Sequence, residues 1–205
     1  KRIAVCGSKE DRHGIVLTAS YPAKWMGVKT GMTIWQAQQC CHDLVIVPPH
    51  YTEYMRYSGY VREILQDYSD QIEGFGLDES WVDVSGSMGL FGNPMTIAQE
   101  ISSRVKKELG ITVSIGVSTN KVTAKLGSDY KKPDGITRIE PDNYKEVVYP
   151  LPVQDLLYVG PATQRKLNSY GIRTIGQLAE TNPKTLQGWF GKVGCLLSAF
   201  ARGLD

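Results

Sequence analysis

The sequence predicts an α+β protein of three parts, and its central segment supplies the main observation. From residue 51 to residue 139 the expected order is helix, hairpin, helix, strand, helix, strand. With one strand added in front, the first part of this order is the β-α-β-β-α-β split unit. A β-rich segment precedes it, and the last quarter of the chain is helical around a glycine turn.

The N-terminal part begins with two short β-rich runs, Ile3–Cys6 and Gly14–Thr18. The polar residues 8–13 separate them, which predicts a hairpin with a loop. A short helix over 33–41 is expected next, with Ile34, Ala37 and Cys40 or Cys41 inward. The apolar run Leu44–Val47 follows it and ends at two prolines.

Three polar side chains, Thr18, Tyr21 and Lys24, lie at the end of the second run and just after it. Their spacing of i, i+3 and i+6 brings a hydroxyl, a phenol and a cation near one face of a turn or helix, where they could clasp an anionic ligand. The alternative is an amphipathic helix start that ends at Gly27, and spacing alone favours this alternative.

The central part starts with a long helical pattern over 51–68, and after the hairpin a second helix begins at Asn93-Pro94. Asn is a favourable N-cap and Pro suits the first helical position. Apolar residues recur every four positions along this helix, from Ile97 to Leu109. The further expected elements are a strand over 111–117, a helix over 119–130, a turn over 132–135 and a strand over 136–139.

The hairpin, residues 74–84, joins two apolar runs at the adjacent carboxylates Asp78 and Glu79. Asp and Glu are depleted in strands, so the pair is expected at the turn or at a strand end. Neighbouring strand residues point to opposite faces, so both carboxylates can reach one ion only where this alternation breaks. Hard cations such as Mg²⁺ prefer oxygen ligands of this kind. An ordinary exposed turn is the alternative that the dipeptide alone favours.

The composition is that of an ordinary soluble globular protein, with 41% hydrophobic and 21% charged residues. There is no long apolar run and no signal-peptide region at the start, so a cytoplasmic protein without a membrane partner is expected. The four cysteines lack a C-x-x-C spacing, which argues against a zinc site. The net charge of +2 is small, but residues 151–205 carry six Lys and Arg against three Asp and Glu, which is compatible with phosphate contact.

Several segments resemble, in order and spacing, the motifs of one family: Thr18–Tyr21, Leu77–Val84, and Ser114–Lys125 together with Lys132–Ile136. The family is that of the Y-family translesion DNA polymerases of the DNA polymerase IV type, also called the ImpB/MucB/SamB family. The resemblance runs along essentially all 205 residues. Because several ordered motifs are far more specific than any one of them, it favours the anion clasp and the metal-binding hairpin over their alternatives.

The resemblance implies the fold of a right-hand polymerase core. Small fingers would cover residues 1–50, a ferredoxin-like palm 51–140, a linker 141–150 and a helical helix-hairpin-helix thumb 151–205. In the family, a little-finger domain and a peptide that binds a sliding clamp would follow beyond residue 205.

The resemblance also implies template-directed DNA synthesis across damaged DNA, in DNA repair and the SOS response, by two-metal nucleotidyl transfer. Asp78 would bridge two Mg²⁺ ions and Glu79 would ligate the ion that activates the primer end, with a third carboxylate completing the set. The partners would be primer-template DNA and deoxynucleoside triphosphates. The residues implied to bind the triphosphate are Thr18, Tyr21, Lys24 and Lys132.

The C-terminal part resembles a helix-hairpin-helix DNA-binding module, in which an apolar helix and a tight turn after Leu157 lead into a second helix. Backbone N–H groups at such a turn and helix start contact phosphate irrespective of sequence. A plain helical bundle is the alternative. The residues expected to contact DNA are Val159, Gly160, Pro161, Ala162, Thr163, Arg165 and Lys166.

The sequence departs from the family pattern at several places. The family's first metal-binding Asp, and the aromatic residue that excludes ribonucleotides, belong to a strand that would precede Lys1, so the chain as it stands is expected to be inactive. Lys24 stands where Arg is usual, which keeps the charge but loses the bidentate fork. Gly76 stands where Ser is common, and Tyr158 takes the place of the first glycine of the thumb turn.

Two other functions remain open. A nucleotidyl cyclase of the diguanylate type shares the palm, a carboxylate hairpin and an S-I-G-V strand, although the thumb-like module and the segment Thr18–Tyr21 argue against it. A non-catalytic DNA-binding accessory protein derived from a polymerase would also fit, because it needs no third carboxylate.

Overall fold

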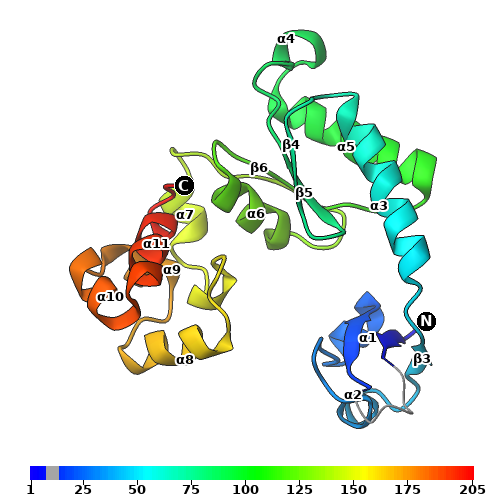
Figure 1. Cartoon of the computed structure of the whole chain (residues 1–205), viewed down its shortest axis with the longest axis horizontal. Helices are drawn as coiled ribbons and strands as arrows, with labels where there is room; N and C mark the ends of the chain where they lie inside the picture. Colours follow the sequence, from blue (N-terminus) through cyan, green and yellow to red (C-terminus); the bar gives the residue numbers. More distant parts are fainter. Residues whose placement is uncertain (8–13) are drawn as a thin grey trace. The chain divides into compact units, whose positions relative to one another are not determined.

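The structure is a computed structural model that describes residues 1–7 and 14–205. These residues form two compact units, Lys1–Arg56 and Tyr57–Asp205 (Figure 1). The loop expected over 8–13 lies outside the described residues. Among the helices that are described, none is long and apolar enough to cross a membrane.

The first unit is built on a three-stranded sheet in the order β2-β1-β3. Strand β1 runs antiparallel to β2, as the predicted hairpin requires, and parallel to β3. Two short helices accompany the sheet, and the buried side chains of Val16, Val28 and Ala37 belong to one core between these elements. The elements are β1 (Ile3–Cys6), β2 (Val16–Ala19), α1 (Tyr21–Trp25), α2 (Ile34–Cys40) and β3 (Val45–Val47).

The first half of the second unit contains two separate two-stranded sheets. Strands β4 and β5 form an antiparallel hairpin, and β6 and β7 pair in parallel. Within the described residues no strand joins the two sheets. The elements are α3 (Tyr51–Gln66), which begins in the first unit, β4 (Ile72–Phe75), β5 (Glu79–Val82), α4 (Met88–Phe91), α5 (Pro94–Leu109), β6 (Ile115–Val117), α6 (Lys121–Tyr130) and β7 (Ile136–Arg138).

Helices α3 and α5 pack against one side of the β4–β5 hairpin (Figure 1). Ile64 of α3 and Ile101 of α5 share a core with Ile72 and Val82, which stand opposite each other in the hairpin. The start of α5 was predicted correctly, since the Asn93 side chain accepts a hydrogen bond from the Thr96 N–H at 3.0 Å. These two helices therefore hold one face of the hairpin in place.

Helix α6 packs on β6 and β7, and its distance from β6 depends on Gly116. A Cβ at position 116 would lie 1.8 Å from the carbonyl oxygen of Ala124 and 2.6 Å from the backbone nitrogen of Ser128, both in α6. Only a residue without a side chain permits this approach. Gly116 therefore sets how closely α6 lies beside the sheet.

The second half of the unit is helical, and its core is continuous with α6. Val122 and Leu126 of α6 belong to the same cluster as Leu167 and Leu197. The side chain of Asp205 also accepts the Lys121 N–H at 3.1 Å, at the start of α6. The elements are α7 (Tyr144–Val148), the 3₁₀ helix η1 (Val153–Asp155), α8 (Pro161–Ser169), α9 (Ile175–Glu180), α10 (Pro183–Phe190) and α11 (Lys192–Ala201).

Three expected elements differ from the observed ones. The strand predicted over 111–117 is confined to β6, because β7 offers only three residues to pair with it. Helix α6 begins at Lys121 rather than at residue 119, since Asn120 is its N-cap. The apolar helix expected before the thumb turn is only the three-residue η1.

Candidate active site

The tip of the β4–β5 hairpin presents the two predicted carboxylates. Phe75 is paired with Glu79 across the hairpin, so the turn consists of residues 76–78. Gly76 has a φ of +77°, a conformation that glycine adopts without strain. Asp78 therefore ends the turn and Glu79 is the first strand residue, at the point where the strand alternation starts. This confirms the expected position at a turn and strand end.

Contacts from α3 and α6 hold this turn in place. The guanidinium of Arg62 on α3 donates to the Gly76 carbonyl at 3.3 Å. The Trp81 indole N–H donates to the Lys121 carbonyl at 2.9 Å, and the Trp81 ring lies 4.9 Å from that of Phe75. The hairpin tip is thus braced from both sides.

A row of alternating charges starts at the hairpin and continues along α6. Lys125 Nζ lies 3.0 Å from Glu79 Oε1 and 2.6 Å from Asp129 Oδ2. Asp129 Oδ1 in turn lies 2.6 Å from Lys132 Nζ. The row Glu79, Lys125, Asp129, Lys132 therefore links the predicted metal ligand with the predicted triphosphate lysine.

The environment shifts the titration of the two middle groups of this row. Burial disfavours the charge of Asp129, but hydrogen bonds from Lys125 and Lys132 outweigh it and lower the pKa of its carboxyl. Burial likewise opposes the charge of Lys125, but its hydrogen bonds to Asp129 and Glu79 outweigh it and raise the pKa of the ammonium. Both groups are therefore charged at neutral pH.

The donor set at the turn suits a hard divalent cation. Asp78 is exposed, and its carboxylate makes no hydrogen bond or ion pair with the described residues. Glu79 offers a second carboxylate beside it, of which Lys125 contacts one oxygen. Within residues 1–7 and 14–205 no group of three or more His, Cys, Asp or Glu side chains could enclose a metal. Two carboxylates and water would form an open Mg²⁺ site.

The predicted anion clasp belongs to the first unit. Thr18 lies in β2 opposite Val5 and is exposed. Tyr21 and Lys24 are neighbours on α1, with the ammonium 5.0 Å from the centre of the phenol ring. The structure thus brings Tyr21 and Lys24 together, whereas Lys132 and the carboxylates belong to the second unit.

The turn before α8 has the conformation that the glycine of a helix-hairpin-helix module would favour. Tyr158 occupies this position with a φ of +67°, which is uncommon for a residue other than glycine. Tyr158 is 56% exposed, and its ring stacks on that of Phe200 with 6.0 Å between the ring centres. Gly160 is the N-cap of α8, so the N–H groups of Ala162 and Thr163 lie in the first turn, where they lack intrahelical acceptors.

The other predicted thumb residues have different environments. Val159 is 6% exposed and belongs to the core. Arg165 is exposed and makes no ion pair with the described residues. Lys166 donates to the carbonyl of Trp189 at 2.5 Å, and its ammonium lies 4.6 Å from the Phe190 ring. Arg165 is therefore the freer cation of the two.

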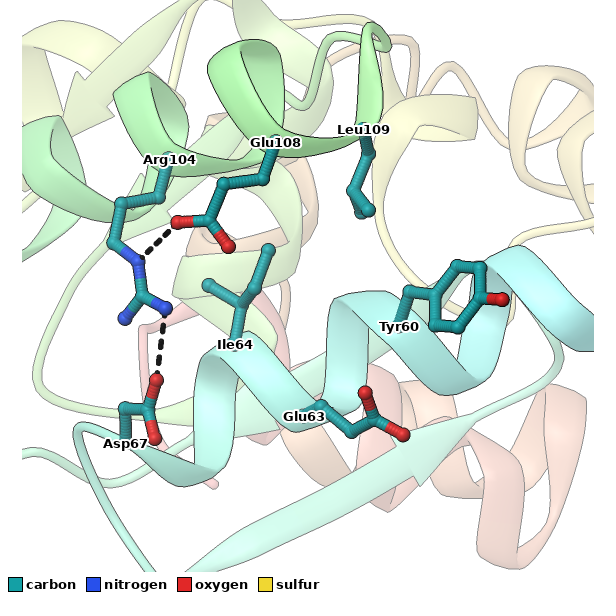
Figure 2. A pocket seen from close by; sticks show the side chains of 7 residues that line it. All are labelled: Tyr60, Glu63, Ile64, Asp67, Arg104, Glu108 and Leu109. Atoms are coloured by element: carbon teal, nitrogen blue, oxygen red, sulfur yellow. Dashed lines mark hydrogen bonds and ion pairs between the residues drawn. The ribbon is translucent and has the colours of Figure 1, made fainter.

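A cavity of about 500 Å³ lies between α3 and α5, and none of these predicted residues lines it (Figure 2). Figure 2 shows Arg104 in its wall, with ion pairs to Asp67 and Glu108 of 2.8 Å each. Hydrogen bonds that this guanidinium donates to Glu108 and Asp67 raise its pKa. The pair with Asp67 ties the end of α3 to α5, whereas the pair with Glu108 lies within α5. Arg104 is therefore engaged in holding the two helices together.

Sequence reasoning did not single out Lys125 and Asp129. Their i, i+4 spacing, and the i, i+3 spacing of Asp129 and Lys132, indicate ion pairs on a helix. The contact between Lys125 and Glu79 has no such local signal, because 46 positions separate the two residues in the chain.

The family follows from a match to a family model. The model of the impB/mucB/samB family matches residues 1–129. The chain belongs to this family. A second model, described as the thumb domain of DNA polymerase-iota, matches residues 154–205 of this family member. These matched residues include Tyr158, which has the positive φ, and helix α8.

Relatives and solved structures agree with this membership. The chain is 52% identical over 205 residues to DNA polymerase IV of Acetivibrio thermocellus, with 100% of this chain and 51% of that protein covered. It is 39% identical to DNA polymerase IV 1 of Bacillus subtilis, with 100% and 49% covered. The chain spans about half the length of these curated relatives.

Among solved structures, an insertion ternary complex of Dbh DNA polymerase matches with a TM-score of 0.88 and 31% identity, over 100% of this chain and 61% of that one. DinB from Sulfolobus solfataricus matches with a TM-score of 0.86 and 30% identity, over 99% and 60%. A Y-family DNA polymerase chimera matches at 0.87 and 29% identity, over 100% and 61%. The predicted fold class, a Y-family polymerase core, is confirmed.

Proposed function

We propose that the chain forms the catalytic core of a translesion DNA polymerase, which extends a primer on a damaged template by Mg²⁺-dependent nucleotidyl transfer. The observation that carries this proposal is the pair Asp78 and Glu79 at a braced hairpin tip, in a chain that belongs to the impB/mucB/samB family. Two relatives that align with 100% and 99% of this chain are named DNA polymerase IV.

Asp78 and Glu79 are the residues that would hold Mg²⁺. The metal would supply charge neutralisation for the attacking and leaving oxygens of an in-line displacement. Within the described residues the carboxylate of Asp78 has no hydrogen-bond or ion-pair partner, and Lys125 contacts only one oxygen of Glu79. No side chain needs to act as the nucleophile, because the primer's 3′-hydroxyl takes that role.

A third carboxylate would be carried by a strand that lies between the two sheets of the second unit. Sheets β4–β5 and β6–β7 share no ladder within the described residues, although they belong to one compact unit. A strand that paired with both would complete the β-α-β-β-α-β unit that the sequence predicts. Its carboxylate would then lie in the same sheet as the hairpin.

The remaining predicted residues would bind the substrates. Lys132 and the fingers residue Lys24 offer cations that would neutralise a triphosphate as charge develops on the leaving group. The fingers residues Thr18 and Tyr21 offer hydroxyls that would donate hydrogen bonds to it. At the start of α8, the first-turn N–H groups of Ala162 and Thr163 and the exposed Arg165 suit a DNA phosphate. We place the enzyme in DNA repair and the SOS response in the cytoplasm, with a sliding clamp as a further partner.

Single-nucleotide primer extension with Mg²⁺ tests the proposed function. The assay compares the 205-residue chain with the native gene product that contains it, on undamaged and on damaged templates. Extension by the native gene product on both templates is the expected result. Primer-template binding without any extension would favour a DNA-binding accessory protein, and nucleotide cyclisation without a primer would favour a nucleotidyl cyclase.

A further inference from the structure

Lys125 stands out among the paired cations of the described residues because it is the least exposed of them. Its side chain is 17% exposed, and that of its partner Glu79 is 32% exposed. The neighbouring pair, Lys121 and Glu73, also joins α6 to the hairpin but is 52% and 57% exposed. Water screens the outer pair much more than the inner one.

The position of Lys125 is set by the framework rather than by Glu79 itself. Gly116 brings the α6 backbone into direct contact with β6. The Trp81 indole attaches the carbonyl of Lys121, one turn before Lys125, to β5. The ammonium is therefore held beside the hairpin whether or not Glu79 has another partner.

We propose that Lys125 is a positioning residue for Glu79, which holds one oxygen of this carboxylate beside the hairpin turn and competes with the metal ion for it. The proposal rests on the proposed function, in which Glu79 is a metal ligand. A cation 3.0 Å from the carboxylate orients it and also weakens its attraction for a second cation.

Asp129 moderates this competition. It shares the Lys125 ammonium with Glu79, at 2.6 Å, and its other oxygen is paired with Lys132. When Asp129 carries its charge, Lys125 is divided between two carboxylates. If Asp129 is made neutral, the ammonium is left to Glu79 and the metal meets a stronger competitor.

These roles predict that substitutions of Lys125 and of Asp129 change the affinity for divalent metal in opposite directions. Lys125→Met and Lys125→Gln remove the competing cation, so divalent metal binds more tightly by about threefold or more. Asp129→Asn weakens metal binding by about the same factor, for the reverse reason. Lys125→Arg keeps the charge and stays within about twofold of the native affinity. A purely structural role for Lys125 would instead weaken binding in all of its variants.

The experiment measures the affinity of the native gene product for Mn²⁺, a carboxylate-binding paramagnetic probe, from the electron paramagnetic resonance signal of the free ion. Lys121→Met is the matched control, because it removes a cation of the same helix and the same hairpin from the exposed pair. It is expected to leave Mn²⁺ affinity within about twofold of native. Circular dichroism melting of every variant accompanies the titration, and Lys125→Arg and Asp129→Asn decide the question if the neutral Lys125 variants do not fold.

Two reference variants separate the failure of this proposal from that of the proposed function. If Asp78→Ala and Glu79→Gln leave Mn²⁺ affinity unchanged, the metal site itself is wrong and the role of Lys125 fails with it. If those two variants lose Mn²⁺, but Lys125→Met binds Mn²⁺ no more tightly than the native protein, the role of Lys125 alone is wrong. Tighter binding by Lys125→Met and weaker binding by Asp129→Asn support it.

Discussion

Replacement of Gly116 by alanine tests the packing that brings α6 to the hairpin. The added Cβ would lie 1.8 Å from the Ala124 carbonyl oxygen, whereas ordinary contacts of a Cβ lie at 3.4–4 Å. The atoms it would meet belong to the α6 backbone, which cannot turn aside as a flexible side chain can. Helix α6 must therefore retreat from β6.

The cost of this retreat belongs at the upper end of the range for overpacked cores, about 3 kcal/mol of the free energy of unfolding. For a unit of the size of Tyr57–Asp205, this corresponds to a fall in Tm of roughly 6–12 °C. Because α6 also carries Lys125, the retreat draws the ammonium away from Glu79. A loss of stability and altered metal binding should therefore occur together.

Gly59→Ala provides the matched control for this substitution. Gly59 lies inside α3, and a Cβ there would meet no atom of the described residues within 4 Å. Alanine should stabilise this helix by about 0.5–1 kcal/mol. Thermal unfolding followed by circular dichroism measures both variants. A Gly116→Ala protein with an unchanged or higher Tm would refute the close packing of α6 on β6.

Three further outcomes are expected. Tyr144→Phe removes a buried hydroxyl that donates to the carbonyls of Phe200 and Ala201 at 3.1 Å. Its loss should lower the free energy of unfolding, measured in urea, by about 1–2 kcal/mol. An unchanged free energy of unfolding would contradict the hydrogen bond. Burial, and then the charge of Asp129, raise the pKa of Asp155, so its charged form is disfavoured in the folded state. Asp155→Asn should therefore stabilise the protein at pH 7 by less than about 1 kcal/mol. This gain should vanish near pH 3, where Asp155 is protonated in both the folded and the unfolded protein. Equal gains at both pH values would contradict a raised pKa of Asp155. Lys132→Ala should raise the nucleotide KM about tenfold or more, and an unchanged KM would make Lys132 only a surface partner of Asp129.

Much of the fold follows from local sequence signals. The start of α5 is encoded by Asn93 and Pro94, and the inward positions of α2 by the spacing of Ile34 and Ala37. The length of β6 could not be predicted in this way. Ile and Val, which favour strands, recur along residues 111–117. Only the three positions that pair with β7 form a ladder.

The candidate site was only partly predictable for the same reason. Adjacent carboxylates between two strand-like runs indicate a hairpin tip, and the structure has Asp78 and Glu79 there. The role of Lys125 depends on the docking of α6, which Gly116 determines through a contact between distant segments. Periodicity along α6 indicates its partner Asp129 but carries no information on Glu79.

Primer extension by the Asp78→Ala variant of the native gene product tests the central claim most directly. Asp70→Ala is the matched control, because it removes an exposed carboxylate just before the same hairpin. We expect Asp78→Ala to abolish incorporation while primer-template binding stays close to native, and Asp70→Ala to extend normally. Incorporation at the native rate by Asp78→Ala would contradict the assignment of the hairpin tip as the metal-binding active site.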